Sequence, residues 1–170
     1  MKKQSRRNWY LSILTLVVLI GIASYVFITP IFSHEYTQLT ERVEIGLEYT
    51  DISSNKEMYV HPYVENPNSH SDLTITYEEE SFDLQVLDAN GNVLEGAVTK
   101  EYQHRGQSHS EQKQTTLKPG QKEKSVCCYK ITFPQEADRL QLAFQGKVQD
   151  EFGAAEIKET IEVLLRHLSI

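Results

Sequence analysis

The feature that most constrains this chain is a run of 24 residues, from position 9 to position 32, that contains no charged side chain. As a helix this run would be about 36 Å long, which is enough to cross a hydrocarbon core of about 30 Å. Four basic residues and no acidic residue precede it. Because positive charge stays on the cytoplasmic side of a membrane, we expect residues 1–8 to be a cytoplasmic tip and residues 9–32 a single transmembrane anchor. The remaining chain would then be extracytoplasmic.

A cleaved signal peptide is the alternative interpretation of this run. Gly21 and Ala23 place small residues at the −3 and −1 positions of a cleavage site after Ala23. The apolar run continues through residues 25–28, however, so this cut would fall inside the hydrocarbon rather than at its edge. The sequence therefore favours a signal anchor that is retained.

Charge is distributed unevenly along the chain. Its net charge is −7, from 17 Lys+Arg and 24 Asp+Glu. Since residues 1–32 hold four of the basic residues and none of the acidic ones, residues 33–170 carry 13 basic and 24 acidic residues, a net charge of −11. We do not expect so acidic a region to bind nucleic acid through its electrostatic field. The absence of an Asn-x-Ser/Thr sequon fits a bacterial envelope protein.

The chain beyond the anchor is interpreted as a stalk, residues 33–41, followed by one β domain, residues 42–170. Short segments with alternating or continuous apolar residues are separated by turn signals, which is typical of strands. The expected strands are residues 43–49, 58–65, 73–77, 82–87, 93–94, 124–133 and 140–144. Pro62 predicts an edge or bulged position for the second of them. Residues 103–114 contain no apolar side chain and are expected to be a mobile loop.

The last segment, residues 154–168, fits two structures. Its apolar residues match a helical stripe, and they also match a strand in which Glu159 is the one fault. We prefer the strand, because residues 150–153 (Asp-Glu-Phe-Gly) are typical of a hairpin turn. The sequence therefore predicts an all-β fold, an antiparallel β-sandwich of immunoglobulin-like type behind a single transmembrane helix.

Two adjacent cysteines lie in the strand expected at residues 124–133. Neighbouring side chains of a strand point to opposite faces, and the face of Cys127 is the apolar one. We therefore expect Cys127 to be buried and Cys128 to face outward. An outward thiol in an oxidising compartment could pair between chains, whereas a disulfide between the two neighbours would distort the strand.

Two stretches resemble the intracellular proteinase inhibitor family of Bacillus and related immunoglobulin-like domains of Gram-positive surface proteins. They are Leu-Thr-Ile-Thr-Tyr at 73–77 with Phe-Asp-Leu-Gln-Val-Leu-Asp-Ala-Asn-Gly at 82–91, and Thr-Leu-Lys-Pro-Gly at 116–120. The resemblance covers about a fifth of the chain. It implies an immunoglobulin-like fold and, as an expectation, inhibition of a protease. The polar residues 103–114 stand where that family has a Trp-rich segment.

Few residues are spaced for chemistry. His104 and His109 share the polar loop with Glu111, and with His61 and His70 they are candidates for a copper or zinc site. Residues 88–92 have the acidic and amide residues of a calcium loop, but their glycine is misplaced, so that a plain hairpin turn is the better interpretation. No nucleophile elbow, acid–base pair or phosphate-binding glycine loop is found. We therefore expect no enzyme and no cofactor.

These patterns favour a non-catalytic domain that is tethered to the cell membrane and binds a membrane-proximal envelope protein. The regions expected to contact the partner are residues 103–114 and a sheet edge around Pro62. A metal-handling domain that uses His104 and His109, and a proteinase-inhibitor-like domain, are the alternatives.

Overall fold

The computed structural model describes residues 14–18, 30–102 and 112–168. The chain divides into two compact units, residues 1–31 and residues 32–170. In the first unit, residues 14–18 are helical. Across the described ranges, no helix is long and apolar enough to cross a membrane. Most of the expected anchor at residues 9–32, and all of the expected cytoplasmic tip at residues 1–8, lie outside those ranges.

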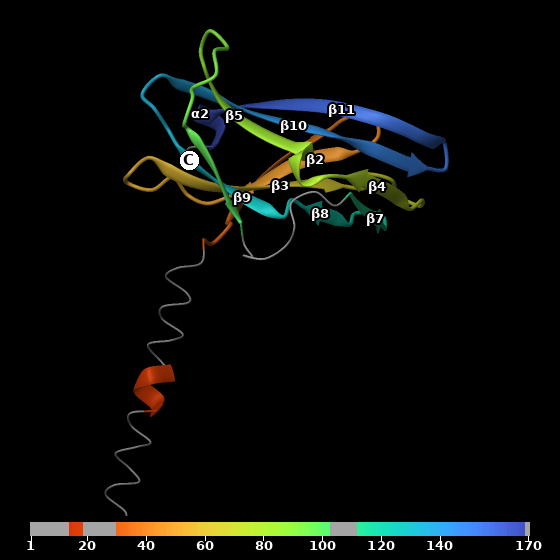
Figure 1. The fold of residues 1–170 in the computed structure, drawn as a ribbon, viewed down its shortest axis with the longest axis horizontal. Helices are drawn as coiled ribbons and strands as arrows, with labels where there is room; N and C mark the ends of the chain where they lie inside the picture. Colours follow the sequence, from red (N-terminus) through yellow and green to blue (C-terminus); the bar gives the residue numbers. More distant parts are fainter. Residues whose placement is uncertain (1–13, 19–29, 103–111, 169–170) are drawn as a thin grey trace, which may run out of the picture. The chain divides into compact units, whose positions relative to one another are not determined.

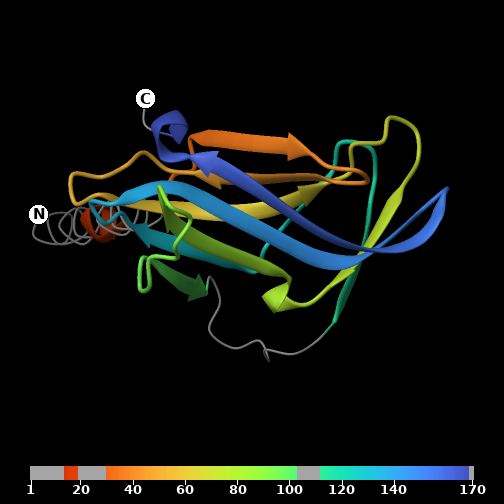
Figure 2. The ribbon, with the colours of Figure 1, turned by 90° about the horizontal axis from the view of Figure 1, so that it is seen from above.

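Residues 32–170 form two antiparallel sheets (Figures 1 and 2). Sheet A has the strand order β1 (His34–Leu39), β2 (Glu44–Tyr49), β3 (Glu57–Glu65), β9 (Cys127–Thr132) and β6 (Val98–Tyr102), with β8 (Lys122–Lys124) also paired to β3. Sheet B has the order β11 (Gly153–Leu164), β10 (Ala137–Asp150), β4 (Leu73–Tyr77) and β7 (Lys113–Leu117), with β5 (Phe82–Asp88) also paired to β10. The short helices η1 (Glu79–Ser81) and α2 (Leu165–Leu168) complete the described elements.

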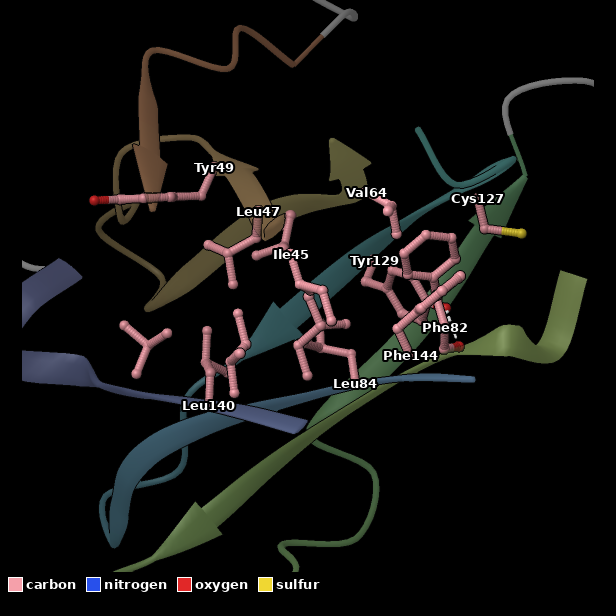
Figure 3. Close-up of a cluster of buried hydrophobic side chains, with 14 of the residues drawn as sticks. Ile45, Leu47, Tyr49, Val64, Phe82, Leu84, Cys127, Tyr129, Leu140 and Phe144 are labelled. Atoms are coloured by element: carbon pink, nitrogen blue, oxygen red, sulfur yellow. Dashed lines mark hydrogen bonds between the residues drawn. The ribbon is translucent and has the colours of Figure 1, made fainter. Parts of the chain in front are cut away.

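The core lies between the two sheets (Figure 3). Ile45 and Leu47 of β2 alternate with polar residues and are fully buried, as the period of a half-buried strand requires. From sheet B, the rings of Phe82 and Phe144 lie with their centroids 4.9 Å apart. Tyr129 of β9 reaches across and donates its hydroxyl hydrogen to Phe82 O at 2.9 Å. One polar contact therefore joins the layers inside an otherwise apolar core.

Most of the expected strands and turns are confirmed. The glycines of the two expected hairpin turns have positive φ angles, which glycine adopts without strain: 86° at Gly91 and 104° at Gly153. Gly120, which ends the Thr-Leu-Lys-Pro-Gly stretch, has a φ angle of 70°. Of the expected strand at 93–94, only an isolated bridge from Val93 to Leu87 is present. The ambiguous last segment is a strand as far as Leu164, and α2 follows it. The all-β expectation therefore holds for the region after the apolar run.

The expected stalk, residues 33–41, is instead largely the edge strand of sheet A. All six residues of β1 pair with β2, from His34 opposite Tyr49 to Leu39 opposite Glu44. The sequence does not indicate this strand. An edge strand covers little of the core, so that β1 needs no row of apolar side chains. The β domain therefore begins at residue 32 rather than at residue 42.

Pro62 lies inside sheet A rather than at an edge, so that of the two expected positions the one beside a bulge is found. β3 has β2 on one side and both β8 and β9 on the other. Between the pairs Val60–Tyr129 and Tyr63–Lys124, β3 has two residues and the opposite segment has four, which makes a bulge at residues 125–128. The carbonyl of Pro62 accepts a hydrogen bond from Ser125 N at 2.9 Å on that side. The N–H and C=O groups of a strand residue point the same way. The side of Pro62 that lacks an N–H donor therefore faces the bulge, where no ladder hydrogen bond needs that donor.

Candidate functional site

The histidines expected to hold a metal are not brought together in the described part of the chain. His104 and His109, with Glu111, lie outside the described residues. His61 is buried in β3 with Nε2 2.7 Å from the carbonyl oxygen of Ser125, and its ring centroid lies 5.6 Å from that of Phe32. His70 is exposed, and its ring forms a hydrogen bond with the hydroxyl of its neighbour Ser69. Among the described residues, no group of three or more His, Cys, Asp or Glu side chains could hold a metal ion.

Both cysteines are buried, so the expectation that Cys128 is exposed to the solvent is wrong. Cys128 does lie on the outer side of sheet A, but only 5% of it is exposed. Cys128 pairs with Glu101 of β6 and lies in the bulge beside β3, and its thiol reaches the carbonyl oxygen of Glu101 at 3.6 Å. Burial, reinforced by the charge of Glu101, raises the pKa of the Cys128 thiol. Because the thiolate is the reactive form of a cysteine, the raised pKa makes Cys128 less reactive.

In the turn that has a calcium-loop composition, residues 88–92, the carboxylate accepts hydrogen bonds from the residues of the turn itself. Asp88 accepts hydrogen bonds from the side-chain and backbone nitrogens of Asn92, each at 2.8 Å, and from Asn90 N at 2.8 Å. These hydrogen bonds, those of Asn92 first, hold the pKa of Asp88 below its ordinary value. The arrangement is that of a plain hairpin turn, as the sequence indicates.

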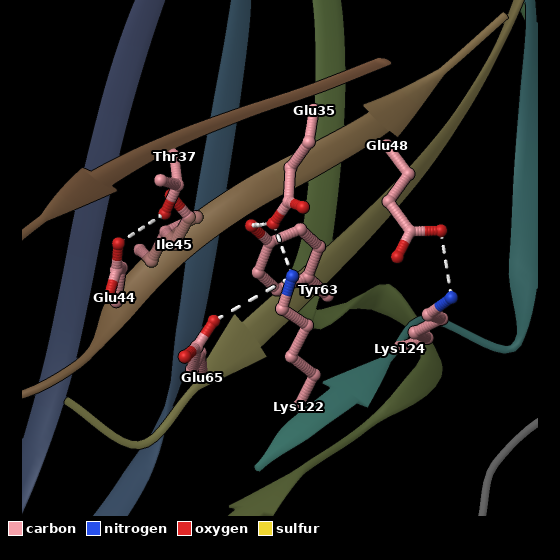
Figure 4. Close-up of polar contacts among 9 residues, drawn as sticks. All are labelled: Glu35, Thr37, Glu44, Ile45, Glu48, Tyr63, Glu65, Lys122 and Lys124. Atoms are coloured by element: carbon pink, nitrogen blue, oxygen red, sulfur yellow. Dashed lines mark hydrogen bonds and ion pairs between the residues drawn. The ribbon is translucent and has the colours of Figure 1, made fainter. Parts of the chain in front are cut away.

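The most organised polar cluster of the domain lies on the outer face of sheet A (Figure 4). Tyr63 of β3 donates its hydroxyl hydrogen to the carboxylate of Glu35 on β1. The ammonium group of Lys122 on β8 pairs with the same carboxylate, lies 4.4 Å from the centre of the Tyr63 ring and is 3.8 Å from Glu65 Oε2. Lys124 pairs with Glu48 of β2 at 2.7 Å. The cluster, which we call the sheet A charge cluster, thus connects β1, β2, β3 and β8.

Register explains how these residues meet. Glu48 lies opposite Glu35 on one side and opposite His61 on the other, so the three share the outer face. Gly46 lies opposite Tyr63, and its missing side chain leaves the space that the phenol ring fills. As a result Tyr63 is fully buried although it points away from the core.

The ionisable groups of the cluster respond to one another. The hydrogen bond from Lys122, followed by that from Tyr63, lowers the pKa of Glu35. Burial and the hydrogen bond to Glu35 raise the pKa of Tyr63. For Lys122, burial acts downward, but the hydrogen bond and charge of Glu35 prevail and raise its pKa. The arrangement stabilises the charged carboxylate and ammonium and the neutral phenol, which suits attachment of an edge strand rather than proton transfer.

A second feature is a hollow of about 580 Å³ in sheet B. It lies where β4 ends and η1 begins, next to Gln145 and Gly146 of β10, which pair with neither β4 nor β5. Its lining combines carboxylates, amines and amides, and Lys147 and Glu156 already pair at 3.4 Å. Because charges of both signs are mixed there, the hollow presents no field that would select one charged ligand.

A third feature is formed by two exposed apolar side chains, one in the turn of the β10–β11 hairpin and one at the end of β1, on segments that an ion pair joins. Figure 2 shows this turn at the end of the domain opposite α2. Arg42, in the turn after β1, pairs with Asp150 at 2.8 Å, and Asp150 also accepts a hydrogen bond from Phe152 N at 2.8 Å. Phe152 is 79% exposed and Leu39, at the end of β1, is 64% exposed. We call these two residues the distal apolar pair.

Sequence reasoning missed the charge cluster and the distal apolar pair. The cluster joins residues 87 positions apart, Glu35 and Lys122, and this contact depends on strand register. The signal for Phe152 was available, since a large aromatic residue in a predicted hairpin turn has no core to enter.

Comparisons with known proteins define no family for this chain. No family model matches it, and no curated protein does. Among solved structures, a match is the GAE domain of GGA2p from Saccharomyces cerevisiae, at 12% sequence identity and a TM-score of 0.36, over 76% of this chain and 97% of that domain. A likeness at this level supports no inference about function. The resemblance to the proteinase inhibitor family stays a prediction.

Proposed function

We propose that this chain is a membrane-tethered, extracytoplasmic binding domain of immunoglobulin-like type, which acts on a membrane-proximal protein partner without catalysis. Residues 9–32 are its anchor and the N-terminus is cytoplasmic. The basic residues before the apolar run and the antiparallel pairing of both sheets support these parts of the proposal.

The observation that carries the binding role is the distal apolar pair. Leu39 and Phe152 are the most exposed large apolar side chains among the described residues of the β domain. Arg42 and Asp150 join the two segments that bear them, which fixes the backbone beneath both. Aromatic side chains such as Phe are enriched at protein interfaces, and exposed apolar surface marks sites of protein interaction.

Membrane topology is tested first with the full chain. A tag after Ile170 should be removed by protease added to intact cells, while a tag before Met1 should be protected. Removal of the N-terminal tag, or release of an untethered domain into the medium, would refute the anchor.

Partner binding is tested by chemical cross-linking in cells, followed by purification of the full chain from detergent extracts. We expect a partner in constant stoichiometry, reduced when Leu39 and Phe152 are both replaced by Ser. Val93→Ser is the matched control, since Val93 is 45% exposed and lies in a different turn. Recovery of the chain alone would count against a binding role.

A further inference from the structure

The edges of the two sheets differ in their protection against pairing with another strand. An edge strand exposes unpaired N–H and C=O groups, and proteins commonly block such an edge with a charged side chain that points inward. Three edges here carry one, opposite a core residue: Glu159 of β11 faces Phe144, Lys100 of β6 faces Tyr129 and Lys113 of β7 faces Tyr77. Since directly opposed residues of an antiparallel pair point to the same face, these three charges are directed inward.

Two further strand sides are closed in other ways. Along β5, Leu94 N donates to Val86 O at 2.8 Å, and the hydroxyl of Tyr129 donates to Phe82 O at 2.9 Å. β8 is only three residues long, and two of the three are lysines. Both features are recognised protections of a sheet edge.

β1 lacks these protections along most of its length. Its inward-facing residues are His34, Tyr36 and Gln38, none of which is Asp, Glu, Lys or Arg, and only His34, at the start of the strand, pairs with a carboxylate, that of Asp51 at 2.6 Å. The strand contains neither proline nor lysine. Within the described part of the chain, β1 pairs with β2 and with no other strand. Among the described strands, β1 is therefore the long edge that is open to a further strand.

The free backbone groups of this edge follow from the hydrogen-bond pattern. Thr40 N donates to Val43 O at 2.9 Å, and these two residues continue the register of β1 with β2. In an antiparallel ladder the bonded residues alternate, so the even-numbered residues of β1 bond to β2. The N–H and C=O groups of Glu35, Thr37 and Leu39 consequently point away from the sheet.

We propose that this open edge of β1 binds an extended segment of another protein, which adds to sheet A as a strand and carries basic and apolar side chains. The inference deepens the proposed function and rests on it. Main-chain hydrogen bonds to Glu35, Thr37 and Leu39 give the affinity, and side chains that alternate along the added strand give the specificity. Leu39 offers the apolar contact. Glu41 and Glu44 offer negative charge, and the Glu44 carboxylate accepts a hydrogen bond from the Thr37 hydroxyl at 2.7 Å.

Charge decides between this occupant and a second copy of the chain. Residues 33–170 have a net charge of −11, so two copies repel each other, whereas a basic segment is attracted. Glu35 is already paired with Lys122, which removes one charge from the centre of the edge. The edge therefore presents a neutral centre and an acidic, apolar end.

The test uses a photoreactive phenylalanine analogue at position 39 of the full chain, in membranes of its native host. Thr37→Pro removes the free N–H together with the hydroxyl that donates to Glu44 Oε1 at 2.7 Å, and proline is tolerated where the N–H of an edge strand faces solvent. Thr37→Val is the matched control, which loses the hydroxyl but keeps the N–H. Gln38→Lys, which supplies the inward charge that other edges carry, is compared with Gln38→Met. Thermal unfolding of each variant establishes that it folds.

We expect one adduct of constant mass with a second protein, unchanged in Thr37→Val and Gln38→Met. We expect its yield to fall by about tenfold or more in Thr37→Pro and Gln38→Lys, because main-chain pairing is lost. An adduct that is indifferent to Thr37→Pro overturns the inference, as does an adduct with lipid or with a second copy of the chain. The same photoreactive analogue at position 152 separates the two proposals. Adducts at position 152 without adducts at position 39 refute only the open edge. The absence of adducts at both positions refutes the binding role as well.

Discussion

Replacing Gly46 by Ala tests how firmly the outer face of sheet A is packed. A Cβ atom at this position would overlap Cζ and Oη of Tyr63 and lie 2.7 Å from Cε1. Ordinary contact between carbon atoms is about 3.5–4.0 Å, so the ring must move by about 1 Å. Because Tyr63 is fully buried and is bonded to Glu35, it has little room to move.

The expected cost combines two effects. Overpacking of a well-packed site costs about 1–3 kcal/mol. A weakened hydrogen bond to a charged acceptor adds part of about 1.5–3 kcal/mol. We expect Gly46→Ala to lower the free energy of unfolding by about 3 kcal/mol, which corresponds to a fall of about 10 °C in Tm for a domain of this size.

Urea unfolding of residues 32–170 measures this cost, and a double-mutant cycle assigns it to the ring. In a Tyr63→Leu background the overlapping ring atoms are absent, so the same substitution at Gly46 should cost less than about 1 kcal/mol. A cost below about 1 kcal/mol in the wild-type background would refute the reasoning, and so would an equal cost in both backgrounds.

Three further predictions concern Tyr77, the thiols and the loop histidines. Burial and the hydrogen bond to a carboxylate raise the pKa of Tyr77. As the pH rises above about 10, the unfolded chain therefore loses this proton before the folded chain does, and the stability falls. Tyr77→Phe should lessen that fall, measured as urea midpoints between about pH 9 and 11. Cys127 and Cys128 should react with a thiol reagent only at the rate of unfolding, and rapid modification of either in the native domain would contradict their burial. Titration with Cu(II) and Zn(II) should show binding no tighter than about micromolar, at the weak end of specific sites; tight binding that is lost in His104→Ala with His109→Ala would establish the metal-handling alternative.

What the sequence could predict depends on how much of each strand faces the core. β2 and β5 place apolar residues on every second position, so their alternation is visible without a structure. β1 has a single large apolar residue on its inner face, Tyr36, and its pairing became apparent only from the register with β2. Pro62 left an edge and a bulge as alternatives, and only the register of β3 with β8 and β9 shows that a bulge in the neighbouring segment accommodates this proline inside the sheet.

The site was less predictable than the fold for a related reason. Alternation assigns a side chain to a face but does not tell which residues of other strands cover it. Cys128 lies on the face that alternation predicts and is nevertheless buried, since its strand is flanked on both sides. Glu35 and Lys122 meet only because β1, β2, β3 and β8 are aligned in one particular register.

The loss of the expected stalk bears on where a partner must lie. A stalk of eight or nine residues would have let the domain move some distance from the membrane. In the structure, residue 34 already belongs to sheet A, and Phe32 packs against His61 of β3. If residues 9–32 span the membrane as we propose, the chain between the anchor and the open edge measures only about 7 Å at full extension. A partner strand that pairs with Glu35, Thr37 and Leu39 must therefore be presented close to the membrane surface. Under both proposals the edge strand would connect to the anchor and receive the partner strand, and its six pairs with β2 together with the sheet A charge cluster hold it in sheet A.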